Sequence, residues 1–145
     1  MQDTSPYTEN VLGYRWNIRD DKWEFTISNI AYRNGEITRR DILKVLNGFY
    51  DPIGLISAFI VTGKIILRMV YASESKIGWD DPIHPHIQKE WKKFLLQIPN
   101  LGKLSFRRSI TPPGAIGNPQ LVIFSDGAKP AYGAVAYARW KVKDG

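Results

Sequence analysis

Apolar and polar residues alternate over the N-terminal part of the chain. Two runs place large apolar side chains on one face of an extended segment: Leu12, Tyr14 and Trp16 in the first, and Trp23, Phe25 and Ile27 in the second. Residues 18–21 lie between the runs and have the composition of a polar turn. Because a strand exposes alternate residues on opposite faces, this pattern predicts an antiparallel β-hairpin between Val11 and Ile27.

The apolar spacing becomes helical after Asn34-Gly35. Thr38 and Asp41 stand in the positions of a capping box, in which a hydroxyl and a carboxylate satisfy the open amides of a helix start. Four apolar residues follow at helical spacing: Ile42, Val45, Leu46 and Phe49. We expect a short amphipathic helix that ends at Asp51-Pro52, since proline lacks the N–H that a continuing helix needs.

Two longer helices are predicted further along the chain. The first begins at Leu55 or Ile56, runs to about Tyr71 and is apolar over most of its circumference, which is typical of a helix buried between neighbours. The second carries its apolar residues on one face and its polar residues on the other, and Pro99-Asn100 is expected to stop it. The apolar face consists of Ile87, Trp91, Phe94, Leu95 and Ile98, and the polar face of Gln88, Lys89, Glu90, Lys92 and Lys93.

The last third of the chain returns to strands. A Pro/Gly-rich connection covers residues 111–119, and residues 104–108 before it read as an edge strand. Leu121 to Phe124 is an apolar run of the buried-strand type, and Gly133 to Trp140 is a second strand after the turn at residues 127–130. The fold class is therefore α+β, with a hairpin at each end and helices between.

Composition sets broad limits on function. The 145 residues are 43% hydrophobic and 12% aromatic, which is globular, and a net charge of +6 favours polyanionic partners such as nucleic acid. The absence of cysteine excludes disulfides, thiolate zinc sites and cysteine nucleophiles. No basic-then-apolar signal stands at the N-terminus, and no apolar run reaches the length of a membrane span. We therefore expect an intracellular protein, cytoplasmic or nuclear, with no membrane partner.

Asp126 is the one residue that resembles a catalytic position. It follows an apolar strand and precedes a tight turn, where a carboxylate held by a rigid sheet can serve as a magnesium ligand in a two-metal nuclease. The residues alone also fit an ordinary hairpin turn. The histidine pair is separated by one proline, so we interpret His84 as a residue at a helix start, and the paired aspartates 20–21 and 80–81 as turn and cap residues.

Basic residues on two of the predicted helices are candidates for contact with nucleic acid. Arg39, Arg40 and Lys44 cluster on the first helix, and a second group lies on the polar face of the third helix. Cations along a helix neutralise phosphates without reading base sequence. The alternative for each group is a solvated helix face.

Three segments, in this order, resemble the polymerase polyprotein of BEL/Pao-type LTR retrotransposons. The first is Val11-Leu12-Gly13-Tyr14-Arg15-Trp16-Asn17 with Asp21-Lys22-Trp23. The second is Thr38-Arg39-Arg40-Asp41-Ile42-Leu43 with Phe49-Tyr50-Asp51-Pro52-Ile53-Gly54-Leu55-Ile56 and, further on, Gly78-Trp79-Asp80-Asp81-Pro82. The third is Val122-Ile123-Phe124-Ser125-Asp126 with Ala131-Tyr132-Gly133-Ala134. The order of these motifs over nearly the whole chain is more specific than any one of them.

The resemblance implies four regions. Residues 1–35 correspond to the end of a reverse-transcriptase palm, with a primer-grip-like hairpin in which Leu12, Gly13 and Tyr14 contact nucleic acid. Residues 36–103 correspond to a helical thumb-like region with Arg39, Arg40 and Lys44 at the nucleic acid. Residues 104–118 form a connection, and residues 119–145 are the first hairpin of an incomplete ribonuclease H-like sheet.

By the same resemblance, Asp126 is the first of four acidic residues that bind Mg²⁺ in the intact parent enzyme. The implied partners are a primer–template duplex or RNA–DNA hybrid and the remainder of the polyprotein. No Tyr-x-Asp-Asp motif is present, and the other ribonuclease carboxylates are expected downstream, so this fragment is predicted to bind no metal tightly and to be inactive alone. The alternative is a non-enzymatic nucleic-acid-binding or scaffold domain retained from a decayed element.

Overall fold

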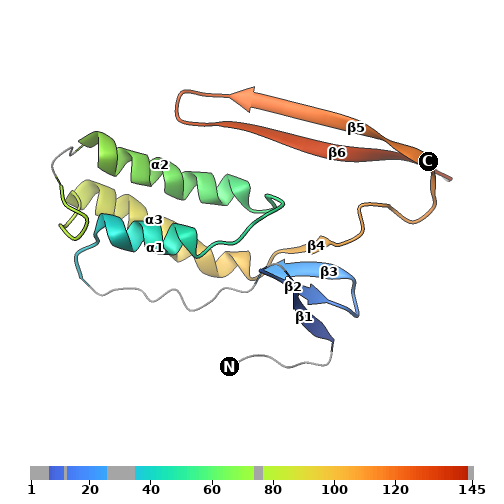
Figure 1. Cartoon of the computed structure of the whole chain (residues 1–145), viewed down its shortest axis with the longest axis horizontal. Helices are drawn as coiled ribbons and strands as arrows, with labels where there is room; N and C mark the ends of the chain where they lie inside the picture. The colour runs from blue at the N-terminus through green and yellow to red at the C-terminus, as the bar shows by residue number, and fades with distance from the viewer. Residues whose placement is uncertain (1–6, 12, 26–34, 74–76, 144–145) are drawn as a thin grey trace. The chain divides into compact units, whose positions relative to one another are not determined.

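The computed structural model describes residues 7–11, 13–25, 35–73 and 77–143 (Figure 1). Leu12, Ile27 and Asn34 therefore lie outside the described residues. The architecture is α+β, as the sequence predicted. The chain divides into two compact units, Met1–Ser105 and Phe106–Gly145, which we call the N-terminal and C-terminal units.

An antiparallel sheet opens the chain. Its strands are β1 (Thr8–Val11), β2 (Tyr14–Asn17), β3 (Lys22–Phe25) and β4 (Ser105–Arg107), in the order β1-β2-β3-β4. The predicted hairpin is confirmed as β2 and β3, and the predicted edge strand as β4. The first strand of the hairpin begins at Tyr14, and Val11, where the prediction placed the start of the hairpin, belongs to β1. Strand β1 was not predicted, because its residues show no alternation of apolar and polar side chains.

The β2–β3 hairpin has one aromatic face. Tyr14 pairs with Phe25 and Trp16 with Trp23 across the two strands. The ring centroids are 5.4 Å apart in the first pair, in edge-to-face geometry, and 6.4 Å apart in the second. Such cross-strand aromatic pairs stabilise a hairpin by about 0.2 to 1 kcal/mol each. Tyr14 and Phe25 are buried, so this face is directed into the N-terminal unit.

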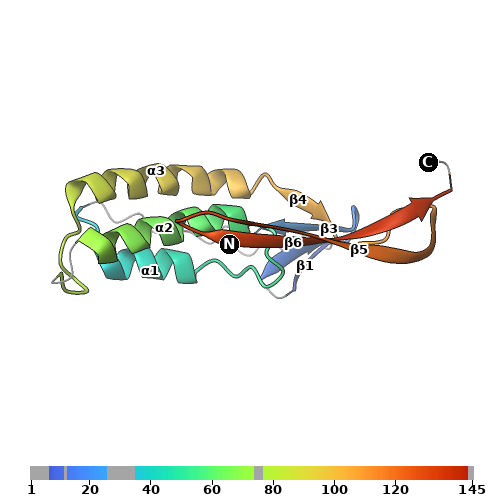
Figure 2. The ribbon, with the colours of Figure 1, turned by 90° about the horizontal axis from the view of Figure 1, so that it is seen from above.

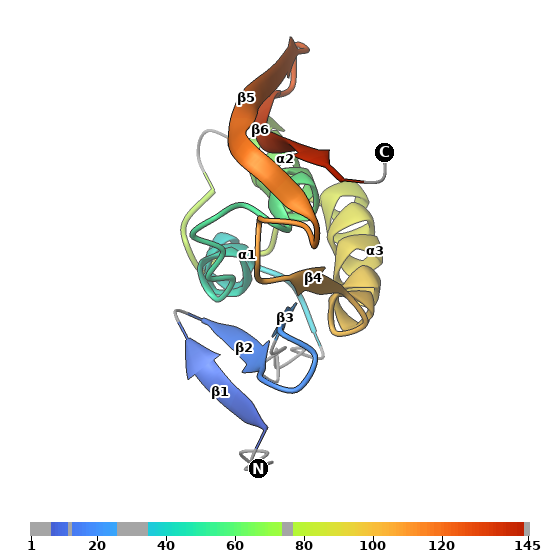
Figure 3. The same cartoon turned by 90° about the vertical axis from the view of Figure 1, so that its right-hand side faces the viewer.

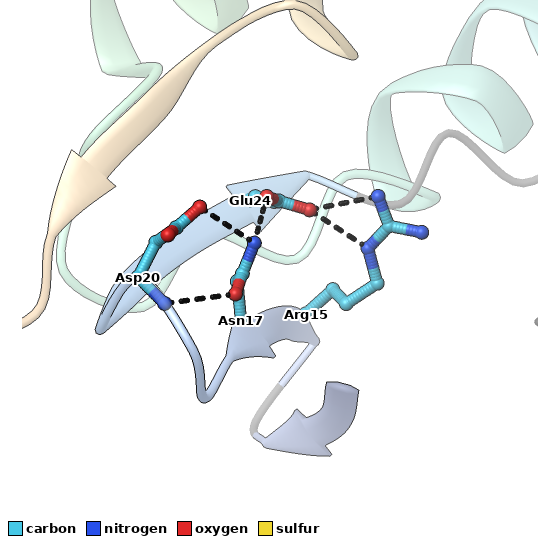
Figure 4. A network of polar contacts seen from close by, with 4 residues as sticks. All are labelled: Arg15, Asn17, Asp20 and Glu24. Carbon is cyan, nitrogen blue, oxygen red and sulfur yellow. Dashed lines mark hydrogen bonds and ion pairs between the residues drawn. The ribbon is translucent and has the colours of Figure 1, made fainter. Parts of the chain in front are cut away.

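The opposite face of the same hairpin is polar (Figure 4). Arg15 donates to Glu24 at 3.0 Å and 2.7 Å, and the Asn17 amide donates to Glu24 at 3.1 Å. The hydrogen bond from Asn17 is the largest cause that lowers the pKa of the Glu24 carboxyl; burial opposes it, and the contact with Arg15 adds to it. The side chain of Asn17 also accepts from the backbone N–H of Asp20, which orders the turn as predicted.

Within the described part of the chain, three helices accompany the sheet: α1 (Arg39–Asn47), α2 (Ser57–Ser73) and α3 (Pro85–Leu101). They lie side by side in Figures 1 and 2, and the nearly end-on view of Figure 3 shows α2 between α1 and α3. Among the described residues, no helix is long and apolar enough to cross a membrane.

Helix α1 begins as predicted but ends earlier. The backbone N–H and hydroxyl of Thr38 donate to the Asp41 carboxylate at 3.0 Å and 2.8 Å, and the hydroxyl accepts from the Asp41 amide at 3.2 Å, so the capping box is confirmed. The prediction that the helix continues to Asp51-Pro52 is wrong. The helix ends at Asn47, and Phe49 packs edge-on against Phe59 with a centroid distance of 5.8 Å.

Helix α3 begins at the predicted place and continues past the predicted stop. The side chain of His84 accepts from the His86 amide, which confirms it as the residue that starts the helix. The expected stop at Pro99-Asn100 is wrong, because the helix includes Pro99 and ends at Leu101. Proline in the last turn forfeits one hydrogen bond only, and Ile98 and Leu101 on either side of it are buried.

The core of the N-terminal unit lies among the helices. Its buried residues are Ile37, Ile42, Leu46, Ile66, Val70, Ile83, Ile87, Trp91, Phe94 and Ile98. Phe94 stacks on Phe59 at 4.5 Å and on Trp91 at 4.9 Å between centroids. A Cβ on Gly63 would come within 2.5 Å of Leu46 and 2.9 Å of Phe94, so the close packing of all three helices requires glycine there.

The C-terminal unit contains the antiparallel pair β5 (Ala115–Gly127) and β6 (Tyr132–Val142). Both strands are longer than predicted. Strand β5 begins inside the segment expected to be a connection, because the pairing resumes at Ile116 beyond an irregularity that contains Gly117 with φ +70°. The predicted hairpin is therefore confirmed in type, and its first strand is extended at both ends, to Ala115 and to Gly127.

Apolar side chains occupy both faces of the β5–β6 pair. The pairing places Val122, Phe124, Val135 and Tyr137 on one face, and Leu121, Ile123, Ala134 and Ala136 on the other. Leu121 is 71% exposed and Ile123 is 62% exposed, so the burial expected for this strand is not observed. Strands that are apolar on both faces are typical of a sheet covered from both sides.

Candidate functional site

Asp126 lies within strand β5 rather than after it, opposite Gly133 of β6. Its carboxylate is exposed and accepts a hydrogen bond from the backbone N–H of Gly127 at 2.8 Å. The pairing puts it on the same face as Phe124 and Tyr137, whose rings are 6.1 Å apart in edge-to-face contact. The sheet therefore presents a carboxylate at a fixed place next to an aromatic pair.

A two-metal centre is not assembled by the described residues. Within them, no three His, Cys, Asp or Glu side chains lie close enough to hold a metal ion together. Asp126 offers the oxygen ligand that Mg²⁺ prefers. One carboxylate cannot fix two cations at the spacing that phosphodiester hydrolysis requires, so the described side chains alone do not fit the metal centre that the resemblance implies.

Gly13 and Tyr14, which the resemblance placed at nucleic acid, contact the loop that follows α1. Gly13 has φ +82°, and a Cβ at this position would come within 2.4 Å of the Tyr50 ring. The Tyr14 hydroxyl donates to the Asp51 carboxylate at 2.5 Å. Tyr14 is only 3% exposed. The hairpin motif therefore packs against the Tyr-Asp-Pro-Ile-Gly-Leu motif within the N-terminal unit. Leu12, the third hairpin residue expected to contact nucleic acid, lies outside the described residues.

Asp51 is the centre of this contact. Its carboxylate also accepts from the backbone N–H groups of Leu55 at 2.8 Å and Ile56 at 2.9 Å, just before α2 begins. An acidic side chain at a helix start satisfies amides that have no intrahelical partner. Burial, followed by the hydrogen bond to Asp51, raises the pKa of Tyr14 well above its usual range. The spacing of 37 residues between the partners gives no signal in the sequence.

Arg39 does not lie with the other predicted phosphate ligands. It is buried, and its guanidinium carbon lies 4.8 Å from the centre of the Tyr71 ring. A cation over an aromatic face is a stabilising contact. Arg39 therefore connects α1 to α2, and its predicted contact with nucleic acid would require the side chain to leave this position.

Arg40 and Lys44 lie on the outer side of α1, one turn apart, and both are exposed. The Arg40 guanidinium donates to Asp80 at 2.7 Å and 3.0 Å. Both side chains of this pair are more than 60% exposed, and exposed ion pairs contribute only about 0 to 1 kcal/mol. A phosphate could therefore replace Asp80 at Arg40 at small cost.

The remaining candidates are solvated or structural. On α3, Lys89 and Lys92 are exposed, and Lys93 pairs with Glu90 at 2.8 Å. Asp81 accepts from the backbone N–H of Gly78 at 2.7 Å, which confirms its interpretation as a turn residue. These positions show no feature beyond a solvated helix face and an ordered turn.

Two basic residues of α2 were not considered as ligands from the sequence. Lys64 and Arg68 are exposed and stand one turn apart on α2, and neither was predicted to contact a ligand. Their spacing of four residues was the available signal, because residues at i and i+4 share one helix face.

Comparison with known proteins supports a retroelement origin. Residues 38–145 match the family model of the Pao retrotransposon-like RNaseH-like domain. The match includes the three helices as well as β5 and β6, so the thumb assignment of residues 36–103 stays a prediction. A search of curated proteins found no match, and a search of solved structures found none. Because the family model matches most of the length of the chain, the chain belongs to the Pao retrotransposon-like RNaseH-like domain family.

Proposed function

We propose that the chain is a nucleic-acid-contacting part of a retrotransposon reverse transcriptase/ribonuclease H polyprotein, and that its ligand is an RNA–DNA hybrid or primer–template duplex. The observation that carries the proposal is Asp126: an exposed carboxylate on a strand of the paired sheet, inside the family match. A rigid strand is a suitable support for a metal ligand, because the ligand must be held within a fraction of an ångström.

The proposal assigns Asp126 one ligand position for Mg²⁺ in the intact polyprotein. Mg²⁺ would there supply charge stabilisation at the reacting phosphate, and this chain contributes a single oxygen donor toward it. The two apolar faces of β5–β6 support the view that further strands and helices cover this sheet in the intact protein. We infer that this chain by itself does not hydrolyse RNA.

A thumb-like role for α1 to α3 is the second part of the proposal. It rests on the exposed cations of α1, Arg40 and Lys44, which can neutralise phosphates of a bound duplex. The contact of Tyr14 with Asp51 holds the primer-grip-like hairpin against these helices. Such a connection would keep the hairpin and the helices in one orientation on a primer–template duplex.

A non-enzymatic nucleic-acid-binding or scaffold domain is the alternative. It is favoured by one observation: the described residues contain no group of acidic and histidine side chains that could hold a metal ion. Binding without hydrolysis, even in an extended protein, would be the result that this alternative predicts.

Hydrolysis of the RNA strand in a labelled RNA–DNA hybrid tests the proposal. We expect no cleavage by the present chain and cleavage by a polypeptide extended into the rest of the polyprotein. In the extended protein, Asp126→Asn should lower the rate at least a hundredfold, because it removes one ligand charge and preserves shape. The matched control Asp20→Asn, in the turn between β2 and β3, should leave the rate unchanged. Equal cleavage by the Asp126→Asn protein would show that Asp126 is an ordinary strand residue.

A further inference from the structure

The C-terminal end of strand β6 has two unlike faces, because successive residues of a strand point to opposite sides of the sheet. One face is polar and charged, and the other is apolar. The first consists of Tyr137, Arg139 and Lys141, and the second of Ala138, Trp140 and Val142. Arg139 and Lys141 are exposed, whereas Trp140 between them is partly buried. The two cations are therefore directed away from the side on which Trp140 is sheltered.

The same two cations lie on the face of the sheet that carries Asp126. The register pairs Asp126 with Gly133 and Gln120 with Arg139, and Gly133 and Arg139 are an even number of residues apart. At a rise of about 3.4 Å per residue, Arg139 lies about 20 Å along the strands from Asp126, and Lys141 lies about 7 Å further. One face of β5–β6 thus carries the carboxylate near its turn and the cations at its other end.

The charge of Arg139 and Lys141 is not neutralised by a neighbouring acid. Among the residues that the structure describes, neither side chain forms an ion pair. Asp126 is the single acidic residue between Phe106 and Lys143, and its distance of about 20 Å exceeds the screening length of about 10 Å at 0.1 M salt. Lys143, whose amide donates to the carbonyl of Gly114 at 3.2 Å, adds a third positive charge at this end.

We propose that Arg139 and Lys141, which we call the β6 cation pair, bind backbone phosphates of an RNA–DNA hybrid duplex whose reacting phosphate lies at Asp126. The proposal rests on the proposed function and names the residues that hold its ligand at a distance from Asp126. Cations that contact phosphates fix the position of a duplex without reading its sequence.

The separation of the carboxylate from the cation pair favours a duplex over a single strand. A duplex is stiff over about 150 base pairs, so it can meet two fixed points about 20 Å apart without losing conformational freedom. Strands also twist in a right-handed sense, which rotates the cations relative to Asp126 along the face. A ligand whose backbone winds can follow that rotation.

Fluorescence anisotropy with a labelled RNA–DNA hybrid, over a series of salt concentrations, tests the proposal on the full chain. A hybrid of about 18 base pairs, at about 3.4 Å per pair, is long enough to pass over Asp126 and both cations. Arg139→Gln/Lys141→Gln should weaken binding about tenfold at about 0.1 M salt, and the slope of log affinity against log salt should become shallower by about 2, since each phosphate contact contributes about 0.9. The matched control Lys89→Gln/Lys92→Gln removes the same charge from the exposed face of α3 and should change affinity less than about threefold. Circular dichroism establishes that each variant is folded.

A second pair of variants tests which face of the sheet the duplex contacts. Val135 lies on the face of Asp126 and the cation pair, and its neighbour Ala136 lies on the opposite face. Val135→Glu would place a carboxylate directly beneath the bound phosphates and should weaken binding at least about fivefold more than Ala136→Glu, because repulsion falls with distance.

The outcomes separate this inference from the proposed function. Absence of salt-dependent binding by the unaltered chain would overturn the proposed function itself. Salt-dependent binding that is unchanged by Arg139→Gln/Lys141→Gln, or weakened equally by the α3 control, would overturn the β6 cation pair and leave the proposed function standing. Equal weakening by Val135→Glu and Ala136→Glu would overturn the assignment of the duplex to the face of Asp126. Equal affinity for a single strand of the same length would overturn the duplex as ligand.

Discussion

Two aromatic hairpins among the described residues have different surroundings. In β2–β3, Tyr14 and Phe25 are buried against the N-terminal unit, and Tyr14 is joined to Asp51. In β5–β6, Phe124 is 61% exposed and Tyr137 is 55% exposed, although the two rings are in contact with each other. Aromatic side chains in a strand therefore indicate a need for burial, and only a partner element decides whether that need is met.

Equivalent substitutions in the two hairpins should have different effects on stability. Phe25→Ala removes a buried ring and should lower the free energy of unfolding of the N-terminal unit by about 3 to 5 kcal/mol. Phe124→Ala removes an exposed ring with one aromatic partner, and the loss should stay below about 1.5 kcal/mol. Urea titration followed by tryptophan fluorescence measures both. Similar losses in the two variants would mean that β5–β6 is as well packed as β2–β3.

Removal of one hydroxyl sharpens the comparison. Tyr14→Phe deletes a hydrogen bond to a carboxylate and should lower the free energy of unfolding by about 1.5 to 3 kcal/mol, whereas the matched Tyr137→Phe on the exposed hairpin should change it by less than about 0.5 kcal/mol.

The stabilising effect of the Tyr14 hydroxyl depends on pH. Burial and Asp51 raise the pKa of Tyr14 in the folded state, so the folded chain retains a proton that the unfolded chain releases above about pH 10.

The sign of this dependence follows from linkage. The contribution of Tyr14 is fully present below about pH 10 and is lost as the pH rises toward the pKa of the folded state. The stability difference between the unaltered chain and Tyr14→Phe should therefore shrink between about pH 9.5 and 11. A difference that stays constant over this interval would contradict the buried contact with Asp51.

Glycine positions give the smallest of the three contrasts. In the Gly13→Ala variant, alanine would have to adopt a left-handed backbone conformation, and its Cβ would come within 2.4 Å of Tyr50. The free energy of unfolding should therefore fall by about 1 to 2 kcal/mol. Nothing lies within 4 Å of a Cβ at Gly133 of β6, and Gly133→Ala should be neutral or stabilise by up to about 1 kcal/mol. Thermal unfolding monitored by circular dichroism distinguishes the two. Equal tolerance at both positions would remove the evidence that β2–β3 is packed tightly on the loop after α1.

The types of the main elements were predictable because each leaves a local pattern. Alternation marked β2–β3, a capping box marked the start of α1, a long and mostly apolar stretch marked α2, and helical spacing marked α3. Boundaries that depend on tertiary contacts were not predictable. Phe49 continues the helical spacing of α1 but leaves the helix to pack on Phe59, and Pro99 stays in α3 between two buried residues.

Parts of the candidate site were predictable for the same reason. Asp126 follows from a local strand-and-turn pattern, and its position on the paired sheet is as expected apart from its inclusion in β5. The burial of Arg39 and the exposure of Lys64 depend on which side of a helix meets its neighbour. That rotation is set by packing between helices, here by the close approach at Gly63, and a basic cluster in the sequence does not report it.

The Asp51 carboxylate has a consequence for cooperativity of unfolding. It accepts from the Tyr14 hydroxyl and from two amides ahead of α2, so it is shared between a sheet and a helix that are far apart in the chain. If β2 separated from the loop after α1, the Asp51 carboxylate would lose the hydrogen bond from the Tyr14 hydroxyl. If the start of α2 frayed, the Asp51 carboxylate would shift and the Tyr14 hydroxyl would lose its acceptor. Local opening of either element therefore weakens the other, and the two should exchange their amide hydrogens in a common event rather than independently.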